Sequence, residues 1–236
     1  MSNHALWRRG GLDGVLRVLM PQQCFACGAG SDDGVLCQAC LADLPGVGRT
    51  RCPVCALPVP VAQLCGACLA HVPPYEATLA CLDYAFPVDR IVQSLKYAHR
   101  LAVVRLFIDL MTRQPAPEAD LVLPMPLHEA RLRQRGFNQA AELARPLARR
   151  WGLPVLLDGV VRDLDTRPQA ALPWAERAAN MRGAFRVTRP LEGRRIVVLD
   201  DVMTTGASLA ELARSLKAAG AVRVENRIVA RTPPPA

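Results

Sequence analysis

The stretch "RRIVVLDDVMTTGASLAELARSL", residues 194–216, contains the pattern that decides the fold. An apolar run ends on two adjacent carboxylates, Asp200 and Asp201, and a turn of small and hydroxyl-bearing residues leads directly into a helical pattern. A buried strand followed at once by a helix is typical of an α/β protein with a parallel sheet, in which ligands bind at the carboxyl ends of the strands. We therefore expect both carboxylates to lie at a binding site.

The turn after this strand is suited to a phosphate group. Its backbone N–H groups, including that of Gly206, open a helix, where donors without helical partners and the helix dipole favour an anion. The hydroxyls of Thr205 and Ser208 add donors, and the two carboxylates upstream accept hydrogen bonds from a diol. A ribose 5-phosphate group carries both features. The alternative is a ligand-free strand end with an N-capping Asp and a Thr-rich first helical turn.

The rest of the second half repeats the alternation of strands and helices. Apolar periodicity predicts strands at 78–86, 120–126, 154–161, 194–200 and 222–231, and helices at 88–98, 101–114, 138–152, 173–183 and 206–220. This alternation predicts a parallel sheet covered by helices on both faces.

Eight of the nine cysteines form four Cys-x-x-Cys pairs in two copies of one repeat: Cys24, Cys27, Cys37 and Cys40, then Cys52, Cys55, Cys65 and Cys68. Two such pairs supply the four sulfur ligands that tetrahedral zinc prefers, so we expect two structural zinc ions. Equal gaps favour one zinc in each repeat, and a cross-braced pairing of the first pair with the third is the alternative. Disulfides or a redox-active pair are the other interpretations.

The composition suits one ordinary domain preceded by a small module. The chain has 236 residues, of which 51% are hydrophobic, and Pro73 and Pro74 interrupt any regular element. We predict a module at 1–73, with a short N-terminal helix and the cysteine repeats, and an α/β domain at 74–236. The apolar stretch 11–21 is short and carries Asp13 and Arg17, so we expect no membrane span and a cytoplasmic location.

Several stretches resemble known families. "VVLDDVMTTGAS", residues 197–208, resembles the phosphoribosyl-diphosphate (PRPP) signature of type I phosphoribosyltransferases. Together with the cysteine repeats and residues 94–101, 123–144 and 162–185, the chain is similar to the ComF family, which joins a double zinc ribbon to such a domain and is associated with natural transformation. The resemblance implies a type I phosphoribosyltransferase (Rossmann-like) sheet, PRPP bound with Mg²⁺, and DNA-uptake proteins as partners.

The resemblance also implies the site residues. PRPP would contact Asp200, Asp201, Met203, Thr204, Thr205, Gly206, Ala207 and Ser208, with its pyrophosphate on Arg131, Arg133 and Arg135. The three arginines alternate within five residues, a concentration suited to a multiply charged anion, although a solvated basic turn is the alternative. A loop that closes over the substrate would contribute Arg162, Thr166, Gln169, Arg177 and Asn180. Asp200, Asp201 and Arg177 are the predicted catalytic residues.

Two functions stay open at this point. The first is transfer of the phosphoribosyl group to an unknown acceptor, for which no general base stands out; His99 and His128 are better interpreted as local hydrogen-bonding residues. The second is handling of single-stranded DNA with the PRPP site as a nucleotide sensor. The net charge of +8 favours a polyanionic partner, with Tyr97, Phe137 and Trp174 as stacking candidates. A solvated basic surface is the alternative.

Overall fold

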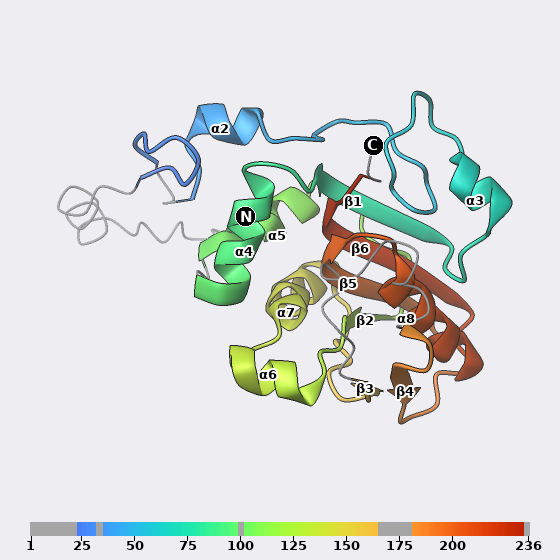
Figure 1. Ribbon diagram of the computed structural model, residues 1–236. Helices are drawn as coiled ribbons and strands as arrows, with labels where there is room; N and C mark the ends of the chain where they lie inside the picture. The colour runs from blue at the N-terminus through green and yellow to red at the C-terminus, as the bar shows by residue number, and fades with distance from the viewer. Residues whose placement is uncertain (1–22, 32–34, 99–101, 165–180, 234–236) are drawn as a thin grey trace, which may run out of the picture. The chain divides into compact units, whose positions relative to one another are not determined.

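The computed structural model describes residues 23–31, 35–98, 102–164 and 181–233. The chain divides into two compact units, Met1–Leu44 and Pro45–Ala236. The first cysteine repeat belongs to the first unit, whereas the second repeat belongs to the same unit as the sheet (Figure 1). The short N-terminal helix predicted near 11–21 lies outside the described residues.

The two cysteine repeats have the same local structure. Each begins with an isolated antiparallel bridge, Gln23 with Gly30 in the first and Arg51 with Pro58 in the second. Each then has a five-residue helix, α2 (Gln38–Ala42) or α3 (Gly66–Ala70), that starts directly after the third cysteine. Equal spacing in the sequence therefore produces equal backbone geometry.

A four-stranded sheet forms the centre of the second unit. Its strands are β1 (Ala77–Asp83), β2 (Leu121–Pro124), β5 (Arg195–Met203) and β6 (Arg223–Arg231). The order is β1-β6-β5-β2, and all neighbours are parallel. Parallel bridging of Val122 with Val155 extends the edge at β2, where a strand was predicted at 154–161. Most of that strand is absent, and β3 (Val160–Arg162) pairs instead with β4 (Phe185–Val187) in a separate antiparallel hairpin.

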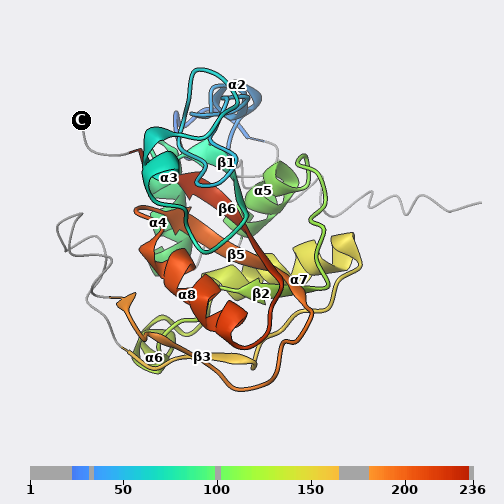
Figure 2. The same cartoon turned by 90° about the vertical axis from the view of Figure 1, so that its right-hand side faces the viewer.

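Helices cover both faces of the sheet (Figures 1 and 2). The helices described after β1 are α4 (Val88–Ala98), α5 (Ala102–Met111), α6 (Glu129–Arg135), α7 (Gln139–Trp151) and α8 (Ala207–Ala218). α5 and α7 pack together on one face, and α8 packs on the other. Ile196 and Val198 of β5 share a buried cluster with Leu212 and Leu216 of α8. The predicted α/β fold with a parallel sheet and a preceding Cys-rich module is confirmed.

Strand β1 lies at an edge of the sheet, and the chain before and within the second repeat covers this edge. The backbone N–H of Thr78 donates to the carbonyl of Pro53 at 3.1 Å, and that of Asp83 to Pro45 at 2.9 Å. Arg49 and Arg51 pair with the Asp83 carboxylate at 2.9 and 2.8 Å. The second repeat is thus built into the α/β unit by backbone bonds and by charge.

Candidate functional site

The eight paired cysteines form two metal sites. In each repeat the four sulfur atoms all lie within 4.8 Å of one another, so the sequential pairing is confirmed and the cross-braced one is excluded. Sulfur atoms held about 2.3 Å from one zinc ion would be spaced on this scale. In the second repeat the backbone N–H of Cys65 also donates to the Cys52 sulfur at 3.4 Å, as outer-shell donors to metal ligands do.

The pKa values of the cysteine thiols in the second repeat are also consistent with a bound cation. Burial acts to raise the pKa of Cys52, but backbone N–H donors from Cys55, Cys65 and Val54 lower it to about 7. Burial and the neighbouring Cys55 thiolate raise the pKa of Cys68. Repulsion among closely spaced thiolates is what a bound divalent cation removes. The donor set therefore fits zinc.

The turn after β5 requires a glycine. Gly206 has φ +83°, and a Cβ atom there would lie 2.6 Å from Cε of Met203. The Thr205 hydroxyl accepts a hydrogen bond from the N–H of Ala207 at 3.2 Å, which helps to cap α8. The turn therefore reverses tightly enough to bring the start of a 12-residue helix to the end of the central strand.

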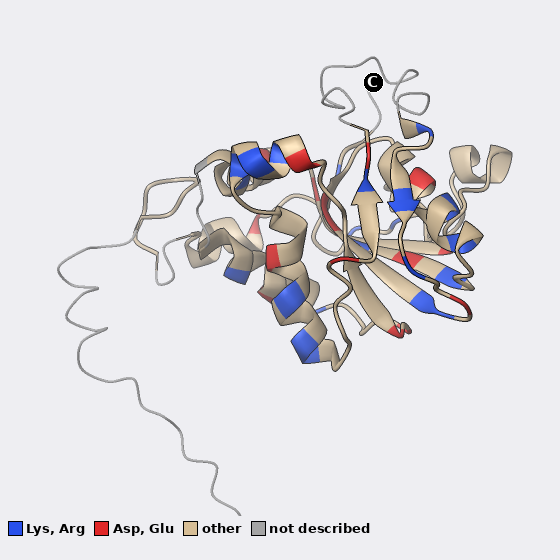
Figure 3. Ribbon diagram, turned by 90° about the horizontal axis from the view of Figure 1, so that it is seen from below, with Lys and Arg blue, Asp and Glu red and all other residues tan. Residues whose placement is uncertain are grey.

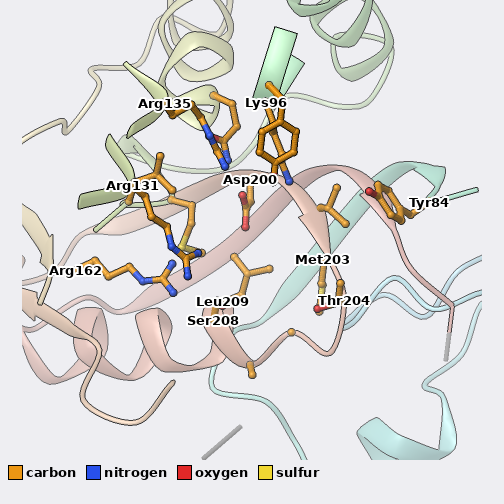
Figure 4. A pocket seen from close by; sticks show the side chains of 17 residues that line it. Tyr84, Lys96, Arg131, Arg135, Arg162, Asp200, Met203, Thr204, Ser208 and Leu209 are labelled. Carbon is orange, nitrogen blue, oxygen red and sulfur yellow. The ribbon is translucent and has the colours of Figure 1, made fainter. Parts of the chain in front are cut away.

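This turn forms one wall of a cavity of about 260 Å³. Its lining combines the carboxyl end of β5, the first turn of α8, and side chains from α4, α6, α7 and β3 (Figure 4). The lining residues are Tyr84, Lys96, Tyr97, Met125, Leu127, Arg131, Arg135, Gln139, Arg162, Asp200, Val202, Met203, Thr204, Gly206, Ala207, Ser208 and Leu209.

The opposite wall is basic. In Figure 4 the side chains of Arg131, Arg135 and Arg162 reach toward the hollow beside Asp200. The guanidinium of Arg135 donates to Gln139 at 2.5 Å and lies 5.6 Å from the centre of the Tyr97 ring. Buried Arg162 lies 5.7 Å from the Phe185 ring. Fixed guanidinium groups on one wall favour a multiply charged anion.

Arg133 lies elsewhere because residues Glu129–Arg135 form a helix. Residues four apart share a helix face, so Arg131 and Arg135 line the cavity and Arg133 does not. Arg133 instead pairs with Glu129 at 2.6 Å, and its side chain is 69% exposed. His128 caps the helix by accepting from the N–H of Ala130 at 3.2 Å, in agreement with its interpretation as a local hydrogen-bonding residue.

The two adjacent acids have different environments. Successive residues of a strand face opposite sides, so Asp200 lines the cavity while Asp201, which is 3% exposed, does not. Asp201 forms an ion pair with Lys96 of α4 at 2.6 Å. Burial, and then the charge of Asp201, raise the pKa of Asp200 well above its ordinary value. Burial alone would also raise the pKa of Asp201, but Lys96 lowers it below its ordinary value.

The cavity therefore collects most of the predicted site residues. Eight of the residues predicted to contact PRPP directly line it: Arg131, Arg135, Asp200, Met203, Thr204, Gly206, Ala207 and Ser208. Thr205 and Asp201 adjoin it in the chain without lining it, and Arg162, assigned to the closing loop, lines it. Thr166, Gln169, Arg177 and Asn180 lie outside the described residues, as do His99 and Trp174.

Sequence reasoning missed Lys96, Tyr84 and Gln139. A signal for Lys96 was present, since the chain has only two lysines among its 29 Lys and Arg residues. Of the two lysines, Lys96 is the one that lies beside Asp200 and Asp201. Burial acts to lower the pKa of Lys96, but the charges of these two acids outweigh it and raise that pKa above its ordinary value. Lys96 holds Asp201 in the charged form next to Asp200.

Among the described residues, no helix has the length and apolar character needed to cross a membrane.

Parts of this chain are similar to known proteins. Residues 15–69 match the family model of the double zinc ribbon domain. Two solved structures are similar in part, with low TM-scores. The first is the glutamine PRPP amidotransferase of B. subtilis complexed with ADP and GMP, with 24% identity, a TM-score of 0.38, and coverage of 53% of this chain but only 25% of that chain. The second is a purine phosphoribosyltransferase from Pyrococcus horikoshii, with 14% identity, a TM-score of 0.31, and coverage of 67% and 94%.

The sequence relatives are more informative. The DNA utilization protein YhgH of Escherichia coli O6:H1 is 32% identical over 197 residues, which cover 78% of this chain and 85% of the relative. Competence protein F of Haemophilus influenzae is 30% identical over 152 residues, which cover 59% and 66%. The extent of these matches shows that the chain belongs to the ComF family.

Proposed function

We propose that the cavity at the end of β5 binds PRPP together with Mg²⁺. The observation that carries the proposal is the meeting, in one cavity of about 260 Å³, of the turn that opens α8, one carboxyl group and a wall of arginines. PRPP has a phosphate, a diol and a pyrophosphate in that order along its length. The lining offers a partner for each of these groups.

Each end of the ligand then has a partner in the chain. The 5-phosphate would lie against the first turn of α8, near the hydroxyls of Thr204 and Ser208. The ribose hydroxyls would donate to Asp200. The pyrophosphate would lie between Arg131, Arg135 and Arg162, whose charges do not depend on pH in the physiological range.

The donor set suits Mg²⁺ that arrives with the ligand. Mg²⁺ is commonly held by one or two carboxylates together with substrate phosphates, and the described lining offers the Asp200 carboxyl group alone. When bound, the ion neutralises charge on the pyrophosphate. The raised pKa of Asp200 fits this assignment, because the carboxylate is disfavoured until a cation or a donor comes near it.

Transfer to an acceptor is a separate step. It would displace pyrophosphate from C1 of the ribose while positive charge develops next to Asp200. The described lining contains no histidine and no glutamate that could act as a base toward an acceptor. We therefore assign PRPP binding first and leave the acceptor, and transfer itself, to a screen for pyrophosphate release.

Isothermal titration with PRPP and Mg²⁺ tests the assignment. We expect wild-type protein to bind, and Asp200→Asn to bind about ten- to a hundredfold more weakly, the loss for one charged hydrogen bond of roughly 1.5–3 kcal/mol. Arg133→Ala is the matched control, because Arg133 lies outside the cavity, and should bind as wild type does. No binding by wild type, or equal binding by Asp200→Asn, would exclude this site.

A second candidate function is single-stranded DNA binding linked to DNA uptake in the cytoplasm. Relatives named for DNA utilization and competence favour it, as does the net charge of +8. In Figure 3, however, basic residues occur on several elements and alternate with acidic ones. The cavity wall brings together the basic side chains of Arg131, Arg135 and Arg162, so DNA and PRPP should compete for it. Salt-independent binding, or no binding at low salt, would remove this candidate.

A further inference from the structure

Arg231, the last residue of β6, joins three parts of the second unit. It is 2% exposed. Its Nε donates to the carbonyl oxygen of Cys55 at 2.8 Å. Its Nη1 donates to the carbonyl oxygens of Met203, at 3.1 Å, and of Thr204. A single buried guanidinium therefore connects the second cysteine repeat to the strand end that precedes the Gly206 turn.

The bonds at Arg231 require the shape of a guanidinium. Its donors diverge in a fixed plane, so one side chain reaches the repeat and the turn at the same time, whereas a lysine ammonium is a single point charge. A third carbonyl, that of Thr232, accepts from the same Nη1 at 2.6 Å. The backbone N–H of Thr232 returns a bond to the Met203 carbonyl at 2.9 Å. The carbonyls at the end of β5 are thus fixed from one side by Arg231.

The repeat side of this connection is a metal site. Cys55 supplies one of the four sulfur ligands, and its own carbonyl is the Arg231 acceptor. Cys52, Cys55 and Cys68 belong to the same buried cluster as Met203 and Leu209. Buried Tyr75 also packs against the turn: its hydroxyl lies 3.1 Å from the position that a Cβ on Gly206 would take. The metal site and the turn are therefore connected by one hydrogen bond and a packed core.

We propose that Arg231 is a positioning residue through which the metal-bound second ribbon holds the turn 203–206 in its anion-binding conformation. The part of this inference that concerns ligand affinity rests on the proposed PRPP site. The part that concerns the conformation of the turn does not. Metal in the second ribbon would then set how strongly the cavity binds a phosphate, although no described residue of the ribbon lines the cavity.

Amide hydrogen exchange of residues 204–208 in the ligand-free protein tests the connection without any ligand. Arg231→Lys keeps the charge and removes the fork, and we expect exchange at the turn to rise about tenfold to a hundredfold, the loss of one or two charged hydrogen bonds. Arg227→Lys is the matched control: Arg227 is also a buried arginine of β6, but it pairs with Glu225 at 3.1 Å. It should leave the turn unchanged.

The metal arm compares Cys65→Ser with Cys37→Ser, the third ligand of each repeat. Each precedes a five-residue helix, but Cys37 belongs to the other compact unit. We expect faster turn exchange only for Cys65→Ser. Titration with PRPP and Mg²⁺ should show about tenfold weaker binding for Arg231→Lys.

Three outcomes decide the inference. Unchanged exchange in Arg231→Lys overturns it, even if Cys65→Ser fails to fold. Equal effects of Cys37→Ser and Cys65→Ser overturn the role of the second ribbon. If wild type does not bind PRPP, the proposed function fails, while the exchange data still decide whether Arg231 holds the turn.

Discussion

The two cysteine repeats are alike in sequence and differ in their surroundings. Both have four sulfur atoms at metal-binding spacing, and both place a five-residue helix after the third cysteine. In the first repeat only Cys24 is buried. In the second repeat Cys52, Cys55 and Cys68 are all buried, within a cluster that includes Met203 and Leu209 on either side of the β5 turn. The cysteine spacing thus predicts that each repeat binds zinc, whereas the packing around each repeat decides which other parts of the protein the metal site stabilises.

Loss of metal should give the largest difference between the repeats. We expect close to two zinc ions per chain in wild type and one in either Cys37→Ser or Cys65→Ser. Only Cys65→Ser should destabilise the Pro45–Ala236 unit, by about 5 kcal/mol or more, because structural zinc contributes roughly 10–16 kcal/mol in small modules. Metal analysis and urea unfolding followed by circular dichroism measure both effects. Equal destabilisation by the two variants would break the comparison.

Asp200 and Asp201 are likewise adjacent in sequence but differ in their surroundings, so their substitutions should have different effects on stability. Asp201→Asn should lower the free energy of unfolding by about 3 kcal/mol, because Lys96, whose side chain is 21% exposed, loses its counter-charge. Asp200→Asn should leave stability unchanged or raise it by about 1 kcal/mol at pH 7, because it removes a carboxylate that Asp201 repels. Urea unfolding measures both changes. Equal losses in the free energy of unfolding would mean that Asp200 and Asp201 play the same structural role.

The pH dependence of these variants has a definite sign. A raised folded-state pKa means that the folded protein holds the Asp200 proton more tightly than the unfolded chain does, so this group makes stability fall as pH rises above about 3.8. The advantage of Asp200→Asn should therefore grow from pH 4 upward. The stability that Asp201 contributes has the opposite dependence: it is present above pH 3.8 and is lost as pH falls through its lowered pKa.

Two glycines give a smaller contrast. Gly28 of the first repeat and Gly206 of the turn have similar φ values, +76° and +83°, but a Cβ meets nothing within 4 Å at Gly28. Gly28→Ala should cost about 1 kcal/mol from backbone strain alone. Gly206→Ala should cost about 2 kcal/mol, since it also displaces Met203. Thermal unfolding of both variants measures this difference, and equal costs would mean that the tight packing at the turn contributes nothing.

The smallest effect is expected on α6. Arg133→Ala should change PRPP affinity and stability by less than about 0.5 kcal/mol, since it removes one exposed pair with Glu129. Arg131 lies on the face of the same helix that lines the cavity, so Arg131→Ala should weaken PRPP binding by about tenfold. The paired titrations check the helix geometry directly: an equal loss in both would require the three arginines to act together, as an extended loop would allow.

Local patterns predicted the parts of the structure that local forces decide. The apolar run before Asp200, the Gly206 turn and the α8 periodicity specify a strand, a turn and a helix in one continuous stretch, and each formed as expected. The cysteine spacing likewise predicted that the four cysteines from Cys24 to Cys40 form one metal site and that the four from Cys52 to Cys68 form the other.

Tertiary packing decided the rest. Short α6 has little apolar periodicity, so "EARLRQR" gave no helical signal and Arg133 was grouped with its neighbours. Lys96 and Arg231 act through partners far away in the chain, which no local pattern contains. The strand period of two, by contrast, was available from the sequence and already implied that Asp200 and Asp201 face opposite sides.

The bonds from Pro45 and Pro53 to β1 have a practical meaning for fragments of this protein. A fragment that starts at residue 74 would leave the N–H groups of Thr78 and Asp83 without these acceptors. An uncovered edge strand is a template on which a second chain can add a strand, so such a fragment should self-associate and aggregate. A fragment that starts at Pro45 keeps its own edge protection and should stay monodisperse.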